Sequence, residues 1–320
     1  MRSSVLFLFT VVVLSIRIGL AQDANQEAKV IANIKLLGGK VRKIPLGNQS
    51  STLRVDFGSS QVTDQNLKEL SQLPDLTELN LNFTKVTDAG LKELRELKNL
   101  KSLQIANYII TDAGLTELTQ IKKLESLTLG FEITDAGLKN LHGLTNMKRL
   151  RLAMTGITDV GLKELSELGN FDSLSFRDTK ITDEGLKELR GQTNLTKLEL
   201  EATWITDVGL KELSELKKLS RLTLSGTRIT DAGVRELRNL TELDELSLNR
   251  TQVTDAALLE LKKLVKLESL ELERTLITDV GLAELAGLTN LRMLDIGRTG
   301  TTEAGRKKLQ EALPKLEIKY

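Results

Sequence analysis

The chain has 320 residues, a formal net charge of +1, and 40% hydrophobic but only 3% aromatic residues. This composition excludes a disordered chain and predicts a core made mainly of aliphatic side chains. The near-zero charge gives no bulk field that would favour nucleic acid or an anionic membrane, and the lack of cysteine excludes disulfides, thiolate catalysis and cysteine metal sites.

Residues 1–21 have the pattern of an export signal. Arg2 precedes an apolar run from Val5 to Ile16, and small residues at Gly19 and Ala21 fit cleavage after Ala21. The run is shorter than the about 20 residues of a membrane-spanning helix, although a retained anchor is an alternative. We therefore expect an exported protein, in the medium or in the periplasm and cell envelope, with no membrane insertion after signal removal.

The two ends of the remaining chain are expected to be caps. In 22–49, the N-terminal cap, a helix from about Asn25 to Leu37 is followed by a glycine stop and a strand. In 310–320, the C-terminal cap, Pro314 ends a helix and the apolar residues that follow form a last strand.

Residues 50–309 are internally repetitive. A Thr-Asp pair recurs at steps of 24 residues, except for one step of 23, with acidic members at Asp64, Asp88, Asp112, Asp135, Asp159, Asp183, Asp207, Asp231, Asp255 and Asp279, and Glu303 at the end. The period predicts a solenoid of about eleven units, in which each unit buries its apolar face against its neighbours.

One unit shows the expected local structure. Leu198 and Leu200 alternate with polar residues, which predicts a short strand with one buried face. Thr206-Asp207 is a helix N-cap signal, and the column of Asp residues is interpreted as caps of this kind. Leu210 begins an apolar series at helical spacing. Each unit is therefore predicted to be a strand, a turn and a short helix.

Two further columns are interpreted as structural. The glycine of the "TDxGL" segment is expected to permit close contact with the neighbouring helix, because Ala257 and Asn66 occupy the same position in other units. A threonine follows each strand, and its hydroxyl is expected to bond backbone groups of the next repeat, at Thr84, Thr155, Thr179, Thr203, Thr227, Thr251, Thr275 and Thr299.

The unit L-x-x-L-x-L-x-x-T-x-[IV]-T-D-x-G-L-x-x-L resembles a leucine-rich repeat over about 50–320. It is most similar to the "ITDxGL" type of ribonuclease-inhibitor-like and F-box-associated arrays, and of many exported bacterial proteins of planctomycete type. Threonine stands here where many such families have Asn or Cys. The resemblance implies an α/β solenoid, a horseshoe with a concave parallel sheet and convex short helices.

Function is expected at strand positions that vary between repeats on the concave side. The charged candidates are Arg149, Arg151, Arg177, Lys197, Glu199, Glu201, Glu271 and Glu273. The first three form a basic cluster, and the acids lie beside it and towards the C-terminus. One interpretation is a charge-complementary protein-binding surface, and the alternative is a solvated sheet whose charges only maintain solubility.

A second candidate is aromatic. Phe83, Tyr108 and Phe131 fall at or beside three successive turns, next to the single 23-residue unit. They are interpreted either as binding anchors or as side chains that repack around the deletion.

Catalysis has little support in the sequence. The Asp column repeats too uniformly to be a set of catalytic carboxylates, and His142, the single histidine, is expected at the surface. There is no Walker or Rossmann phosphate loop, and no cofactor or metal is predicted. The preferred hypothesis is an exported, non-enzymatic scaffold that binds a protein partner, and the alternatives are a carbohydrate or cell-wall binder and a structural envelope protein.

Overall fold

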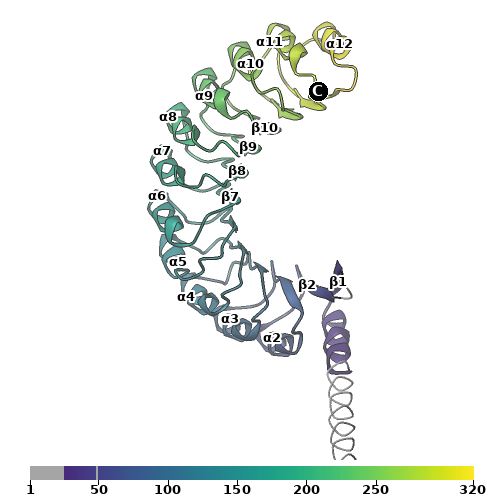
Figure 1. The fold of residues 1–320 in the computed structure, drawn as a ribbon, viewed down its shortest axis with the longest axis vertical. Helices are drawn as coiled ribbons and strands as arrows, with labels where there is room; N and C mark the ends of the chain where they lie inside the picture. The colour runs from purple at the N-terminus through teal and green to yellow at the C-terminus, as the bar shows by residue number, and fades with distance from the viewer. Residues whose placement is uncertain (1–24, 48–49) are drawn as a thin grey trace, which may run out of the picture.

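The computed structural model describes residues 25–47 and 50–320, so the predicted signal at 1–21 lies outside the described residues. The chain curves into a horseshoe with one sheet on its concave side and helices on its convex side (Figure 1). Thirteen strands follow one another in chain order across that sheet. The first pair is antiparallel and the later pairs are parallel, which confirms the predicted α/β solenoid.

The strands are β1 Lys40–Gly47, β2 Ser50–Asp56, β3 Leu76–Asn80, β4 Ser102–Gln104, β5 Ser126–Thr128, β6 Arg149–Arg151, β7 Ser173–Ser175, β8 Lys197–Glu199, β9 Arg221–Thr223, β10 Glu245–Ser247, β11 Ser269–Glu271, β12 Met293–Asp295 and β13 Glu317–Lys319. The labelled helices are α2 Asp64–Leu67, α3 Asp88–Leu91, α4 Asp112–Leu115, α5 Asp135–Lys139, α6 Asp159–Leu162, α7 Asp183–Leu186, α8 Asp207–Leu210, α9 Asp231–Glu236, α10 Asp255–Leu261, α11 Asp279–Glu284 and α12 Glu303–Ala312. Several continue as 3₁₀ segments, η1 Lys68–Gln72, η2 Lys92–Glu96, η3 Thr116–Gln120, η4 Lys163–Glu167, η5 Lys187–Leu189, η6 Lys211–Leu213, η7 Leu237–Asn239 and η8 Leu285–Gly287.

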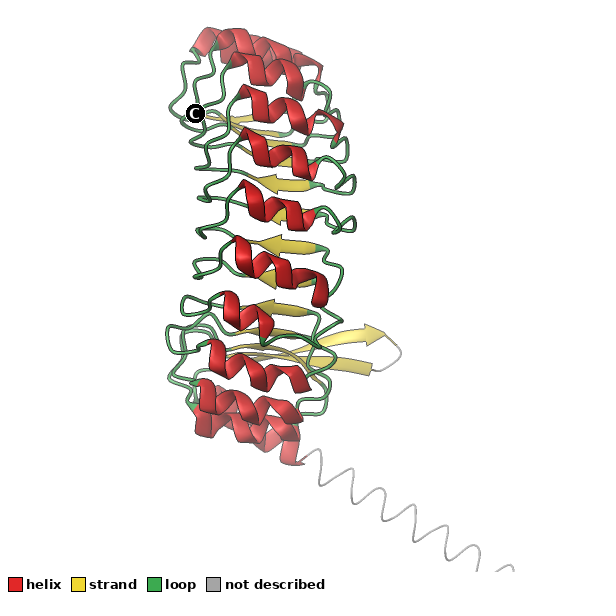
Figure 2. Cartoon of the chain, turned by 90° about the vertical axis from the view of Figure 1, so that its left-hand side faces the viewer, coloured by secondary structure: helices red, strands yellow, loops and turns green. Residues whose placement is uncertain are grey.

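Both ends of the array differ from its repeats. Residues 25–36 are helical, and Gly38, at φ +84°, follows them before β1. Strands β1 and β2 form an antiparallel hairpin that projects past the side of the helical layer (Figure 2). At the other end, α12 is followed by β13, which pairs with β12. Within residues 25–47 and 50–320, no helix has the length and apolar character needed to cross a membrane.

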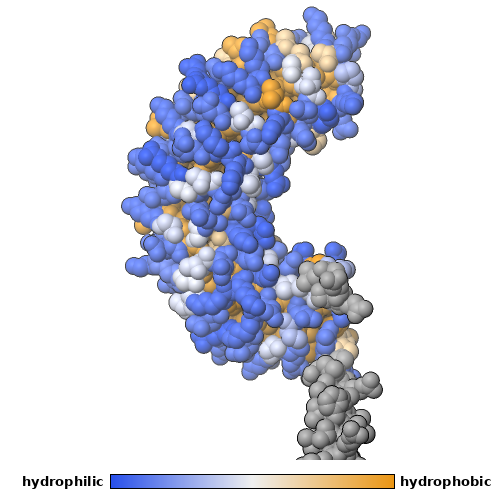
Figure 3. All heavy atoms as spheres, in the orientation of Figure 1, coloured by the Kyte–Doolittle hydropathy of each residue, from blue (hydrophilic) through white to orange (hydrophobic). Residues whose placement is uncertain are grey.

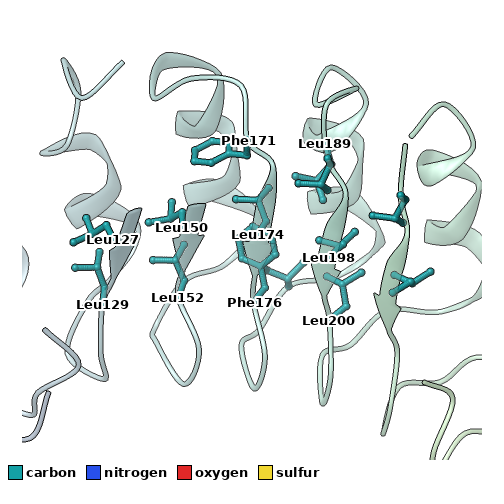
Figure 4. Close-up of a cluster of buried hydrophobic side chains, with 14 of the residues drawn as sticks. Leu127, Leu129, Leu150, Leu152, Phe171, Leu174, Phe176, Leu189, Leu198 and Leu200 are labelled. Atoms are coloured by element: carbon teal, nitrogen blue, oxygen red, sulfur yellow. The ribbon is translucent and has the colours of Figure 1, made fainter. Parts of the chain in front are cut away.

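On the face seen in Figure 3 the surface is mostly hydrophilic. The core beneath it is a continuous stack in which the same repeat position is buried in one unit after another. Leu198 of β8 lies in register with Leu174 of β7 and Leu222 of β9, and these side chains are fully buried. Figure 4 shows the resulting rows of leucines, which Phe171 and Phe176 join in the middle of the array. Burying one such side chain contributes about 1.5–3 kcal/mol, so the 24-residue period directly generates the stabilising contacts.

The carboxylates of the Asp column have a different partner from the predicted one. In each repeat, threonine is the helix N-cap, as Thr206 shows by accepting a bond from the Val208 N–H. Asp183, one repeat earlier, accepts from the Thr206 N–H through Oδ1 at 2.8 Å and from its hydroxyl through Oδ2 at 2.7 Å. The Asp residues are therefore links between repeats and not caps of their own helices, because their side chains point towards the following unit.

This link explains the glycine column. A Cβ on Gly209 would lie 2.4 Å from the Asp183 Oδ1 atom. Asp183 begins the neighbouring helix α7, so the predicted close contact with that helix is confirmed, and its nearest atom belongs to the carboxylate. Asn66 is the informative exception. It lies in the first repeat, and its own side-chain oxygen accepts from the Thr63 N–H at 2.9 Å, as an Asp does elsewhere.

The threonines after the strands also bond differently from the prediction. The Thr203 hydroxyl donates to the Leu200 carbonyl at 2.7 Å, within its own turn, and Thr227 and Thr251 repeat this bond. The role is structural, as predicted, but the hydroxyl donates within its own turn and not to the backbone of the next repeat. The hydrogen bonds that bridge two repeats come instead from the backbone N–H of the residue directly before each threonine, such as Ala202 before Thr203.

Candidate functional site

The turn after most strands holds a residue in the left-handed region of backbone conformation, and the turns after β4 and β5 are exceptions. These residues have φ between +53° and +70°, and they are Ser59, Phe83, Met154, Asp178, Ala202, Gly226, Arg250, Arg274 and Arg298. The N–H of each member before Arg298 donates to a carbonyl of the next turn, as Ala202 does to Ser225 at 2.8 Å. The bonds fix the direction of side chains that differ from repeat to repeat, at the rim of the concave sheet.

A shallow hollow of about 340 Å³ lies where this column has its smallest members. Ala202 and Gly226 occupy two successive turns, and their neighbours in the column are Asp178 and Arg250. Because the side chains of Ala202 and Gly226 are too small to fill the space above the sheet, a depression remains across five consecutive turns. Its lining residues are Arg177, Glu201, Ala202, Ser225, Gly226, Asn249, Arg250, Glu271 and Glu273.

One side of the hollow is formed by an ion pair between two predicted residues. Arg177 follows β7, Glu201 follows β8, and the Arg177 Nε lies 3.2 Å from a Glu201 carboxylate oxygen. Both side chains remain partly exposed, so the pair is available to a partner at the surface of the array.

The opposite side is a hydrogen-bonded acidic group. Glu271 accepts from the Ser247 hydroxyl at 2.7 Å and from the Asn249 amide at 2.8 Å. Asn249 in turn accepts from the Glu273 N–H at 2.7 Å. The structure thus places Arg177, Glu201, Glu271 and Glu273 around one hollow, and neighbouring residues hold the side chains of the first three.

Of the rest of the predicted basic cluster, Arg151 is paired with an acid, Glu199, which also contacts Lys197. Glu199 lies 3.4 Å from Arg151 and 2.5 Å from Lys197. Burial acts to raise the pKa of Glu199, but the hydrogen bond from Lys197 and the charge of Arg151 outweigh it and hold the pKa below its usual range. Arg149 is exposed on β6 and does not line the hollow, so the structure divides the charged candidates into a hollow and a neighbouring ion-pair group.

The three aromatic candidates come together in one cluster. The Tyr108 and Phe131 rings are stacked with centroids 4.0 Å apart, and Phe83 lies 6.4 Å from Phe131. Leu127 to Asp135 spans one residue less than Leu103 to Asp112, which places the deletion in the turn after β5, beside Phe131. The cluster therefore coincides with the deletion, yet Tyr108 remains 66% exposed.

His142 is exposed, as predicted, and lies just after helix α5, in the segment that leads to β6. Its Nε2 atom is 2.8 Å from a Glu164 carboxylate oxygen of η4. In the described part of the chain, no group of three or more His, Asp or Glu side chains is arranged to hold a metal ion.

Sequence reasoning missed the centre of the hollow. Ala202, Ser225 and Gly226 carry no charge or aromatic ring, so a search for chemically active side chains passes over them. A usable signal was the pair of small residues at the same position of two successive repeats.

The fold and repeat have known counterparts. A family model described as Leucine Rich repeat matches residues 72–94, 143–166 and 191–214. The crystal structure of an internalin (inlF) from Listeria monocytogenes str. 4b F2365 is similar at 23% identity, over 81% of this chain and 88% of that one, with a TM-score of 0.58. An internalin C2 (inlC2) from the same strain has 28% identity, over 66% of this chain and 84% of that one, with a TM-score of 0.47.

A comparison with curated proteins finds no match. The likeness to the first internalin concerns the fold, and it agrees with the strand order and register described above. The matched segments are therefore leucine-rich repeats, and the ordered sheet in which they lie is that of an α/β leucine-rich-repeat solenoid.

Proposed function

We propose that this protein is an exported, non-enzymatic scaffold that binds another protein at the hollow on its concave side. The observation that supports the proposal most is the hollow itself, which has Arg177 and Arg250 together with Glu201, Glu271 and Glu273 around a floor of small residues. A partner side chain can enter such a depression and meet charges of both signs.

The scaffold favours binding by preorganisation. Five consecutive turns present the lining residues, and backbone bonds such as Gly226 N–H to the Asn249 carbonyl at 2.8 Å tie each turn to the next. Little conformational entropy is then lost at the surface when a partner binds. Leucine-rich-repeat folds typically serve as protein-binding scaffolds, and this geometry suits that use.

The remaining parts of the proposal rest on the sequence. We infer that 1–21 is a removable signal, that 22–49 and 310–320 cap an array at 50–309, and that export follows from the signal. The "ITDxGL" motif supports placing the array with the exported bacterial type that it resembles.

The test uses a substitution that fills the hollow. Ala202→Arg suits the backbone, because Arg250 and Arg274 already adopt the same left-handed conformation. Lys218→Ala is the matched control, since Lys218 lines a separate surface groove with Ser220 and Glu242. Each protein is used as bait for extracts of the source-cell envelope and medium, and a captured protein is purified for titration calorimetry.

We expect the native chain and Lys218→Ala to bind the captured protein equally, and Ala202→Arg to bind it at least about tenfold more weakly. Equal affinity for all three baits would place the interface outside the hollow. Capture of no protein would remove the main support for a protein-binding role.

A further inference from the structure

A strip of uncharged polar residues lies on the concave side of the N-terminal third. We call Asn82, Gln104 and Thr128, from three successive repeats, the neutral strip. Asn82 donates from its amide to the Gln104 side-chain oxygen at 3.2 Å, and all three residues are partly exposed. Within the described residues, the Gln104 amide nitrogen and the Thr128 hydroxyl donate to no protein group.

Ionised groups flank the strip on both sides. Arg151 of β6 is in register with Thr128 of β5 and lies 3.4 Å from Glu199. Glu78 of β3 lies 3.4 Å from Arg54 of β2, and Asp56 accepts from the Asn80 amide at 2.8 Å. The charged hollow is on later turns, from β7 onwards. The three residues of the strip thus offer hydrogen bonds and carry no charge themselves, and the arginines of β6 lie along one edge of the strip.

The aromatic cluster of Phe83, Tyr108 and Phe131 lies at the end of this strip. Phe83 directly follows Asn82, and Phe131 is three residues after Thr128. A Cβ on Gly130 would lie 2.8 Å from the Ala106 Cα, so the turns after β4 and β5 approach closely and bring the Tyr108 ring onto Phe131. This packing holds the rings in place, while Tyr108 is 66% and Phe83 is 54% exposed.

The combination fits the chemistry of a neutral sugar. A pyranose ring has C–H faces that stack on an aromatic ring and hydroxyl edges that both donate and accept hydrogen bonds. Amides and hydroxyls match those edges because they also donate and accept, and rigid aromatic rings supply the apolar contact. A protein partner would find here none of the charges that line the hollow.

We propose that the neutral strip and the aromatic cluster together form a binding site for an uncharged polysaccharide. The chain would cross successive repeats, stack on the outer face of Tyr108 and bond to Gln104 and Thr128. This site is separate from the hollow, so it does not depend on the proposed protein-binding function.

The test is native affinity electrophoresis of the full chain in gels that contain one soluble neutral polysaccharide each: hydroxyethyl cellulose, xyloglucan, galactomannan, laminarin or glycol chitin. Dissociation constants come from the retardation at several polysaccharide concentrations. The variants are Tyr108→Ala and Gln104→Glu. The latter preserves the oxygen that accepts from Asn82 but replaces the free amide donor with a charge. The matched control is Trp204→Ala, because Trp204 is a 56% exposed aromatic residue outside the cluster.

We expect at least one polysaccharide to retard the native chain and Trp204→Ala equally. Tyr108→Ala should bind about tenfold more weakly, Gln104→Glu should also bind more weakly, and added salt should have little effect because the ligand is uncharged. Thermal melting will show that both variants remain folded.

Three results would overturn the proposal: no retardation by any of the five polysaccharides, unchanged retardation of Tyr108→Ala, or loss of binding in Trp204→Ala alone. Capture of a purified protein that Tyr108→Ala abolishes, without polysaccharide binding, would assign the cluster to a protein partner instead. None of these results depends on Ala202, so they are distinguishable from failure of the hollow.

Discussion

Asp183 and Thr206, in successive repeats, are joined by two hydrogen bonds from one carboxylate, at 2.8 Å to the Thr206 N–H and 2.7 Å to its hydroxyl. The same pairing runs from Asp64–Thr87 at one end to Asp279–Thr302 at the other. A row of two-point contacts therefore links the N-termini of the convex helices. It complements the leucine core on the inside of the array.

Removing one of these carboxylates should destabilise the array. In Asp183→Ala, the Thr206 N–H and hydroxyl lose their acceptors, and we expect a loss of about 1–3 kcal/mol in the free energy of unfolding. Urea denaturation followed by circular dichroism measures this value. Glu188→Ala, an exposed carboxylate in the adjacent η5 segment, should change it by less than about 0.5 kcal/mol. Equal effects of the two substitutions would show that the link is energetically unimportant.

Substitution of alanine by glycine should have opposite effects on the free energy of unfolding in a left-handed turn and in a helix. Ala202, at φ +53°, should gain up to about 1 kcal/mol on substitution by glycine, because the steric cost of its Cβ disappears. Ala283→Gly, at an exposed position of α11, should lose about 1 kcal/mol through helix propensity. Chemical denaturation of both variants gives the comparison. A clear loss of stability in Ala202→Gly would contradict the strain argument.

Glu199 should make stability depend on pH. Its pKa is held below the usual range in the folded protein, so the ionised group contributes its full stability above the unfolded pKa of about 4.3. That contribution is lost as the pH falls through the lower folded pKa. We expect the stability difference between the native chain and Glu199→Gln to shrink on acidification through this range.

Melting temperatures at a series of pH values test this dependence. Lys197→Met removes the hydrogen bond that lowers the Glu199 pKa, so it should reduce the pH-dependent part of the difference. A constant gap between the native chain and Glu199→Gln at all pH values would mean that the Glu199 charge does not contribute.

The sequence was sufficient for the fold because the fold-determining contacts repeat. Leu198 and Leu200 alternate with polar residues, and the same pattern 24 residues away in either direction fixes both the strand and its register. Thr206 could likewise be recognised as an N-cap from its position before a helical apolar series.

Contacts between repeats were harder to predict because they depend on side-chain direction. Spacing alone could not show that the Asp183 carboxylate reaches the next repeat and not its own helix. The left-handed column was also concealed, since Phe83, Met154 and Arg250 adopt a conformation for which only Gly226 gives the usual sequence signal. Of the candidate site, the charged and aromatic members were identifiable, but the hollow depends on the small size of Ala202 and Gly226.

The most direct test of the proposed binding surface is photo-crosslinking from inside the hollow. A photoreactive amino acid is placed at Ala202 in one protein and at Lys218 in another, and each is irradiated in source-cell extract. We expect one adduct of defined mass from position 202 and none from position 218. No adduct at position 202, or the same adducts from both positions, would contradict binding at the hollow.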